Sequence, residues 1–170
     1  IMIISGRVWK YGDDVNTDAI FPGRYTYALL SEQEIGSHAL EDLDPIFNKA
    51  DVKGDIIVAG KNWGCGSARE QAVKCLKVRG IGAIIGKGFS RIYYRNCLNE
   101  GLVTVVCPEA VDCITNGEYV SIDLGGNVIR TTKDRFFFSL YPKFVKGLVF
   151  SGGLLPYVVK MLKEQGKLER

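Results

Sequence analysis

A serine and an arginine lie two residues apart at the end of a glycine-rich loop, and together they suit the binding of an acid group. Glycines at positions 60, 64 and 66 precede Ser67, and Arg69 follows it. A helix that begins here presents unpaired backbone N–H groups and partial positive charge in its first turn. Glycines let a ligand approach that backbone closely, and the planar guanidinium of Arg69 matches a carboxylate. The loop is therefore predicted to bind a small carboxylate.

The spacing of this loop does not match the nucleotide-binding loops. Residues 60–65 lack the second glycine and the Gly-Lys-Ser/Thr ending of a P-loop, and Arg69 stands where G-x-G-x-x-G requires a small residue. A structural interpretation stays open, because Ser67 with Glu70 three residues later is the capping-box pattern of a helix start. A plain cap does not need three glycines and an arginine, which favours a functional role.

The elements around this loop predict an α/β fold. Apolar runs at residues 55–59, 81–85 and 102–107 alternate with helical patterns that begin at residues 67 and 90. This alternation is typical of parallel strands joined by helices. The glycine loop is then expected at the carboxyl ends of the strands, where open sheets bind ligands.

Elements on either side complete the expected domain. A strand is predicted at residues 3–8, and a capping box at Ser31 predicts a helix that runs to about residue 43 and ends before Pro45. In the last third, Gly125-Gly126 predicts a hairpin, followed by a strand near residues 136–138. Two amphipathic helices are expected at residues 144–150 and 154–163, with the Gly152-Gly153 pair and Pro156 separating them.

Composition excludes several classes of protein. The 170 residues suit a single domain over residues 1–170, and a net charge of +3 with scattered cations does not indicate nucleic-acid binding. The apolar runs are too short to span a membrane, and no secretory leader is expected. Five cysteines without a C-x-x-C pair make a disulfide framework, a zinc site or a cluster site in this chain unexpected, and favour the reducing cytoplasm.

Three ordered motifs resemble a known family. Residues 64–70 (Gly-Cys-Gly-Ser-Ala-Arg-Glu) are similar to the Gly-x-Gly-Ser-Ser-Arg-Glu signature of the aconitase superfamily swivel domain. Residues 16–18 (Asn-Thr-Asp) resemble that domain's early Thr-Asp element. Residues 89–92 with Asn96 and residues 101–102 resemble its Phe-Ala-Arg-Ile…Asn…Gly-Leu segment. The resemblance implies a layered β/β/α swivelling domain like the mobile C-terminal domain of aconitase.

The resemblance also implies a hydro-lyase in which this chain is a small subunit. A separate large subunit would carry a [4Fe–4S] cluster, whose iron accepts the leaving hydroxyl of a hydroxy di- or tricarboxylate. This chain would bind no cofactor and no metal. Ser67 would remove the proton next to a carboxylate, Arg69 would clamp that carboxylate, and Asp18 would support a histidine of the partner. Gly66 and Ala68 would contact substrate, although the family has a second serine where Ala68 stands.

The substrate is expected to depend on the loop that contains Arg24, Thr26 and Tyr27. Relatives that act on tricarboxylates place an arginine at the position aligned with Tyr27, whereas an aromatic face suits an alkyl group. The loop therefore favours isopropylmalate, an intermediate of leucine biosynthesis, over homocitrate. A homoaconitase, a methylmalate or dimethylmalate hydro-lyase, and a non-catalytic carboxylate-binding protein stay open as alternatives, and Tyr27 could equally be a core aromatic.

Two further side chains have open interpretations. His38 is the only histidine, and its distance from every motif predicts a surface or core residue rather than a catalytic one. Cys65 lies in the glycine loop, where it could be a reactive thiolate, although a small packing residue is the more common role. Self-association of the isolated chain is expected, because its partner-facing surface would be exposed.

Overall fold

The computed structural model describes residues 2–139 and 141–167. It contains a mixed seven-stranded sheet in the order β4-β3-β2-β1-β5-β6-β7. The strands are β1 (Ile3–Lys10), β2 (Ile56–Ala59), β3 (Ala83–Gly86), β4 (Val103–Val106), β5 (Tyr119–Asp123), β6 (Val128–Arg130) and β7 (Arg135–Phe137). Strands β1 to β4 are parallel to one another, and β1, β5, β6 and β7 are antiparallel. The predicted α/β class is confirmed.

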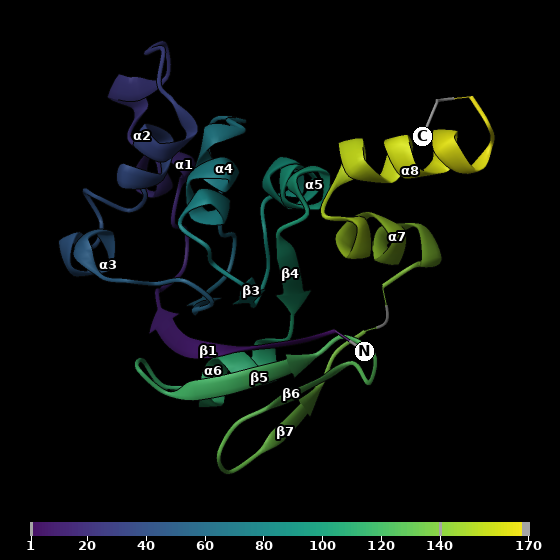
Figure 1. Ribbon diagram of the computed structural model, residues 1–170. Helices are drawn as coiled ribbons and strands as arrows, with labels where there is room; N and C mark the ends of the chain where they lie inside the picture. The colour runs from purple at the N-terminus through teal and green to yellow at the C-terminus, as the bar shows by residue number, and fades with distance from the viewer. Residues whose placement is uncertain (1, 140, 168–170) are drawn as a thin grey trace.

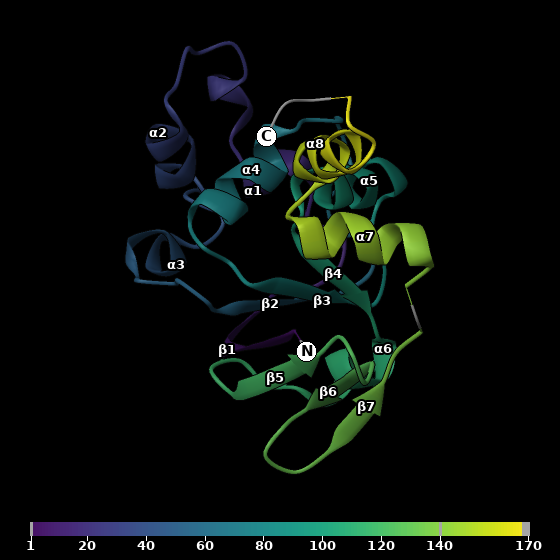
Figure 2. The same cartoon turned by 45° about the vertical axis from the view of Figure 1, so that its right-hand side comes forward.

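The two parts of the sheet meet at β1 and form separate layers. The first part of β1 pairs with β5, from Ile3 opposite Asp123 onward, and its last part pairs with β2, where Val8 lies opposite Ile56. Helices α1, α2, α4 and α5 lie above the parallel strands, and β5 to β7 lie below them (Figures 1 and 2). This arrangement is the layered β/β/α order expected from the resemblance.

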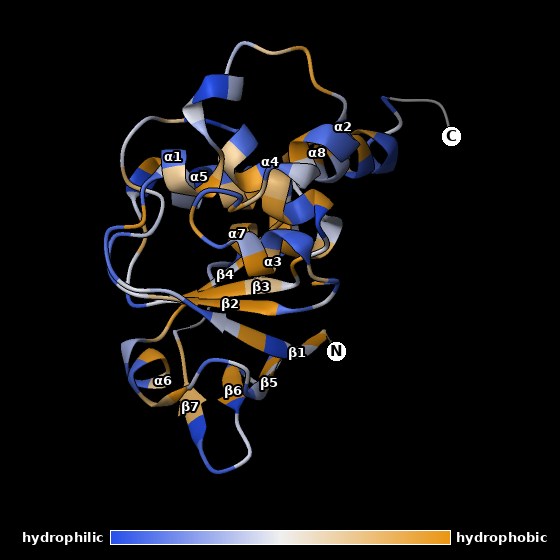
Figure 3. Cartoon of the chain, turned by 90° about the vertical axis from the view of Figure 1, so that its left-hand side faces the viewer, coloured by the Kyte–Doolittle hydropathy of each residue, from blue (hydrophilic) through white to orange (hydrophobic). Residues whose placement is uncertain are grey.

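The parallel strands are buried on both faces. All four residues of β2 and all four of β3 are inaccessible to solvent. Alternate side chains along a strand point to opposite faces, so Ile57 and Ile84 pack under the helices while Ile56 and Ile85 pack toward the antiparallel layer. Figure 3 shows β2 and β3 almost wholly in the hydrophobic colour, between elements of mixed hydropathy. Continuous apolar runs are what a sheet covered on both faces requires.

The helices are α1 (Thr17–Ile20), α2 (Glu32–Ser37), α3 (Pro45–Lys49), α4 (Gln71–Val78), α5 (Arg91–Glu100), α6 (Pro108–Cys113), α7 (Lys143–Ser151) and α8 (Leu154–Glu164). The predicted α5 ends as expected at Gly101, which adopts the left-handed conformation with φ of 72°. The short helices α1, α3 and α6 were not predicted.

The helix predicted from Ser31 to about residue 43 ends earlier. Its capping box forms, because the Ser31 side chain accepts from the Glu34 N–H and Glu34 bonds back to the Ser31 N–H. However, α2 stops at Ser37, and Leu40 adopts a positive φ of 53°. The Leu40 N–H donates to the carbonyl of Ile20 over 2.8 Å, so a tertiary hydrogen bond replaces continued helix.

The predicted hairpin and the two C-terminal helices are present. Strands β5 and β6 pair across the Gly125-Gly126 turn, and Gly152-Gly153 separates α7 from α8. Pro156 does not separate the two helices, because it lies in the first turn of α8, where a missing N–H is tolerated. In the described part of the chain, no one helix has the length and apolarity of a membrane span; α7 and α8 meet those criteria only jointly, as a pair bent by 100°.

Candidate active site

The glycine-rich loop lies at the carboxyl ends of the parallel strands, as predicted. It begins directly after Ala59 of β2, and it is hydrogen-bonded to the segment that follows β1. The Gly64 N–H donates to the Val15 carbonyl, and the Thr17 N–H donates to the Cys65 carbonyl, both over 2.8 Å. The loops that follow β1, β2 and β3 gather at this end of the sheet (Figure 3). The Asn-Thr-Asp motif and the glycine motif are therefore neighbours.

Gly64 is required by the packing of this loop. It has a φ of 78°, and a Cβ atom at this position would lie 2.1 Å from Cγ of the buried Tyr93 ring. Gly66 also has a positive φ, 90°, but a Cβ atom there would meet no atom closer than 3.6 Å. The first glycine thus fits the loop against α5, and the second shapes the backbone just before Ser67.

Ser67 does not cap α4, which corrects the predicted capping box. The helix begins at Gln71, its N-cap is Glu70, and no side chain bonds to that end. Ser67 is exposed, and its carbonyl accepts a 2.8 Å hydrogen bond from the Thr17 hydroxyl. Thr17 is buried and holds the loop in place, a role the sequence analysis did not assign although its motif was noticed.

The Ser67 hydroxyl is consequently available to a ligand. Within the described residues its side chain has no hydrogen-bond partner, and the backbone N–H groups of Ser67 and Ala68 have none either. Two adjacent amides and a hydroxyl without partners thus lie on an exposed stretch from Gly66 to Ala68. These groups could receive an oxyanion or a carboxylate.

Arg69 lies beneath this stretch and connects the two motifs. Only 9% of its side chain is exposed. Its Nη2 donates to Asp18 Oδ1, and its Nη1 donates to the Thr26 hydroxyl over 3.0 Å. A guanidinium has five N–H donors, and the buried Nε has no partner among the described residues. Arg69 therefore has donors that its bonds to Asp18 and Thr26 do not use, and the Nε among them is buried.

The loop predicted to set specificity divides into two parts. Thr26 is held by Arg69, whereas the Tyr27 side chain is 96% exposed and is not a core aromatic. Arg24 forms ion pairs with Glu41 and Asp42. The structure thus places Thr26 beside Arg69, leaves the Tyr27 side chain in solvent and engages the Arg24 guanidinium with Glu41 and Asp42.

His38 belongs to the support of this loop. Its ring stacks on Tyr25 with centroids 3.8 Å apart, and its Nδ1 lies 2.6 Å from Glu41 Oε2. The Arg24 guanidinium also contacts this ring, 4.8 Å from the Tyr25 ring centroid. The expectation of a structural rather than catalytic histidine agrees with these contacts.

All five cysteines are free thiols, and they range from buried to exposed. Cys75 and Cys97 are fully buried, and burial raises the pKa of each thiol above its ordinary value. Cys65 is partly exposed, and its thiol donates to the Asp14 carbonyl over 3.5 Å. In the ranges 2–139 and 141–167, no three His, Cys, Asp or Glu side chains are grouped as metal ligands.

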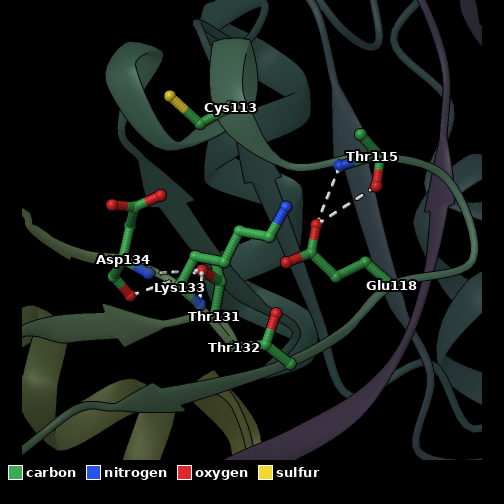
Figure 4. Close-up of a pocket in the computed structure, with 7 residues that line it drawn as sticks. All are labelled: Cys113, Thr115, Glu118, Thr131, Thr132, Lys133 and Asp134. Atoms are coloured by element: carbon green, nitrogen blue, oxygen red, sulfur yellow. Dashed lines mark hydrogen bonds between the residues drawn. The ribbon is translucent and has the colours of Figure 1, made fainter.

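A polar hollow of about 230 Å³ exists on another part of the molecule, between the turn after β6 and the segment after α6 (Figure 4). Figure 4 shows Glu118 bonded to Thr115, and Thr131 bonded to Asp134 and Lys133. Its polar groups mostly bind one another. None of its lining residues belongs to the motifs around Ser67, so it is separate from the candidate site.

Comparisons with known proteins identify relatives over almost the whole chain. Residues 24–110 match the family model "Aconitase C-terminal domain". The 3-isopropylmalate dehydratase small subunit of Heliobacterium modesticaldum is 43% identical over 96% of this chain and 99% of its own length. The small subunit 1 of Thermotoga maritima is 43% identical over 93% of this chain and 96% of its own.

A solved structure agrees with these relatives. The crystal structure of 3-isopropylmalate dehydratase from Methanocaldococcus jannaschii superimposes with a TM-score of 0.91 at 42% identity, covering 98% of this chain and 99% of that chain. Its similarity extends beyond the residues 24–110 matched by the family model. The chain belongs to the family of 3-isopropylmalate dehydratase small subunits, which have the fold of the aconitase C-terminal domain.

Proposed function

We propose that this chain, joined to a large subunit, isomerises 2-isopropylmalate and 3-isopropylmalate by dehydration and rehydration in leucine biosynthesis. The relatives named 3-isopropylmalate dehydratase small subunit support this activity. The observation that carries it furthest is the pairing of an exposed Ser67, whose hydroxyl caps no helix, with a buried Arg69 that bonds to Asp18 and Thr26. A loop built only to start a helix would use the serine hydroxyl as a cap.

In this proposal Ser67 is the base and Arg69 positions the substrate. The Ser67 oxygen takes a proton from the carbon next to a carboxylate, and the electron pair of the broken C–H bond forms the alkene as hydroxide leaves. Arg69 binds that carboxylate and keeps the carbon near the base. The N–H groups of Ser67 and Ala68 stabilise negative charge near the hydroxyl. Because α4 begins only at Gln71, this support comes from the loop rather than from the first helical turn.

The remainder of the site is proposed to come from the large subunit. When bound there, a [4Fe–4S] cluster supplies a Lewis-acidic iron for the substrate hydroxyl, and the described residues of this chain offer no alternative site for it. Asp18 is 64% exposed despite its bond to Arg69, which leaves its second oxygen accessible to a histidine of the partner. Five free thiols suit a reducing, cytoplasmic setting.

Isopropylmalate is favoured over tricarboxylates by the exposed Tyr27. The side chain stands next to Thr26, which Arg69 holds, so its ring is available to an alkyl group of a bound substrate. Arg24 is the cation nearest in sequence, but its guanidinium is engaged by Glu41 and Asp42. A third carboxylate, as in homocitrate, would have to displace these acids to gain that charge.

The proposal is tested by reconstitution with the large subunit from the same organism. Isomerisation is followed through the absorbance of the unsaturated intermediate, and we expect turnover only in the mixture. Ser67→Ala should lower kcat by about 10³-fold, because a positioned base contributes on that scale. Ser5→Ala removes another exposed serine hydroxyl, on β1, and should leave kcat unchanged. Near-normal turnover by Ser67→Ala would show that Ser67 is not the base.

A further inference from the structure

A second feature lies beside the glycine loop and is not used by the chemistry at Ser67. Phe89, Tyr94 and Val106 line an open hollow of about 260 Å³, and Arg91 and Arg95 complete its walls. The two arginines lie one helical turn apart on α5, so their guanidinium groups are on the same side of that helix. Val106 is the last residue of β4, at one edge of the sheet, and is 48% exposed. An apolar hollow is thus bordered by two cations.

Both cations lack acidic partners among the described residues, whereas four of the eight described arginines form ion pairs. Arg7, Arg24, Arg69 and Arg130 form ion pairs, and Arg79 donates to two carbonyls. Arg91 and Arg95 are exposed and have neither an ion pair nor a side-chain hydrogen bond within residues 2–139 and 141–167. Arginine and aromatic side chains at an apolar hollow are the residues that dominate the binding energy of protein interfaces.

The hollow is held rigidly against the candidate active site. Phe89 forms a bridge with Trp63 of the glycine loop, and the Ser90 N–H donates to the Trp63 carbonyl over 2.9 Å. The Trp63 side chain is fully buried, and the Phe89 ring packs over Gly86 of β3. Segments 63–67 and 88–91 therefore form one corner of the molecule. The segment that carries Phe89 and Arg91 is therefore directly bonded to the loop that leads to Ser67.

We propose that the hollow is the docking site of an apolar side chain flanked by carboxylates, carried by the large subunit. The proposal rests on the proposed function, because the partner that must cover Ser67 is the same protein. The apolar side chain fills the space between Phe89, Tyr94 and Val106, and the flanking carboxylates pair with Arg91 and Arg95. This contact fixes the position of the large subunit relative to Ser67 without touching substrate, and its charges accelerate association.

The test measures affinity and turnover separately, with the purified large subunit from the same organism as the probe. Arg91→Glu combined with Arg95→Glu reverses both charges, and Val106→Glu places a carboxylate in the hollow. Arg135→Glu is the matched control, because Arg135 is also exposed and without an ion pair in the described residues, but lies on β7 at the opposite edge of the sheet. Thermal unfolding verifies that each variant is folded.

We expect the double variant and Val106→Glu each to raise the Kd of the complex at least about tenfold, whereas Arg135→Glu leaves it within about twofold. Raising the salt from about 50 mM to about 300 mM should weaken the wild-type complex more than the double variant. At saturating large subunit, kcat and KM should stay within about twofold of the wild type. This combination identifies docking rather than catalysis.

Other results overturn the proposal. Equal Kd values for the double variant and Arg135→Glu would show that the hollow is not at the interface. An unchanged Kd with a raised KM would assign the arginines to substrate instead. Ser67→Ala separates the two claims, since it should bind the large subunit normally and lose turnover. If the wild-type chain neither binds the large subunit nor supports turnover, the proposed function fails, and the docking site fails with it.

Discussion

Arg69 and Asp18 form an ion pair between two motifs 51 residues apart, and its two members differ sharply in exposure. The Arg69 side chain is 9% exposed, and the Asp18 side chain is 64% exposed. The pair therefore balances a buried charge with a carboxylate that solvent and a partner protein can reach. It also joins the loop after β1 to the loop after β2, so the same contact that neutralises Arg69 assembles the candidate site.

Asp18→Asn should destabilise the fold, because it leaves the buried guanidinium without a counter-charge. We expect the free energy of unfolding in urea to fall by about 1–2 kcal/mol, a range kept low because Asp18 itself is well solvated. Asp42→Asn is the control, since it breaks an ion pair in which both partners are half exposed. A loss for Asp18→Asn no larger than that of the control would show that Arg69 does not depend on Asp18.

The two positive-φ glycines of the loop should differ in their tolerance of a methyl group. Gly64→Ala combines a left-handed backbone with a clash against Tyr93, and should cost about 3 kcal/mol or more in unfolding free energy. Gly66→Ala meets only the backbone penalty, about 1–2 kcal/mol, since the space around it is open. Urea denaturation of both variants measures the difference, and equal costs would contradict the packing described for Tyr93.

Tyr27→Arg should change substrate preference without changing stability. The side chain is 96% exposed, so its replacement alters no packing, while the new cation could pair with a third carboxylate. We expect the ratio of kcat/KM for homoaconitate to that for isopropylmalate to rise about tenfold or more. Leu29→Arg is the control, because it adds the same charge at another fully exposed position two residues away. The same rise in both variants would point to net charge rather than position.

Asp123 should contribute stability that is lost in acid. Hydrogen bonds from the Gly126 N–H, and then from Arg130 and the Gly125 N–H, hold the pKa of its carboxyl below the ordinary value of 3.8. A lowered folded-state pKa stabilises the protein above the unfolded-state pKa, and this contribution disappears as the pH falls through the folded-state value. Asp123→Asn should therefore be less stable than the wild type at pH 5, and the gap should narrow below about pH 4.

Urea unfolding at several pH values measures this gap. Glu34, Asp42 and Asp112 also have pKa values lowered by hydrogen bonds, so both proteins lose stability in acid, and only the difference between them reports on Asp123. A gap that stays constant between pH 5 and pH 2 would mean that the carboxylate charge does not stabilise the β5–β6 turn.

Secondary structure was predicted correctly from the sequence where contacts between residues close in the chain determine it. Ser31 with Glu34 and Ser67 with Glu70 are the same pattern, yet only the first forms a capping box. The difference is tertiary: the Thr17 hydroxyl binds the Ser67 carbonyl, and Arg69 reaches Asp18 and Thr26. Such contacts join residues far apart in the chain, so a local pattern cannot reveal them.

Long-range contacts also explain what the sequence did not predict in the candidate site and in the fold. The sequence motifs predicted Ser67, Arg69 and Asp18 as site residues, and these residues are close together in the structure. The ion pairs of Arg24 with Glu41 and Asp42 could not be predicted from the motifs. The early end of α2 at Ser37 depends on the bond between Leu40 and Ile20. The antiparallel pairing of β1 with β5 joins residues more than a hundred positions apart.

That pairing has a mechanical consequence. β1 is hydrogen-bonded to β2 through Val8–Lys10 and to β5 through residues 3–7, so a single strand is the seam between the two layers. If either layer separated from β1, the apolar side chains packed between the two layers would be exposed. Local unfolding of one layer therefore destabilises the other. The molecule should then melt as one cooperative unit, in which the corner that holds Ser67 moves together with both layers.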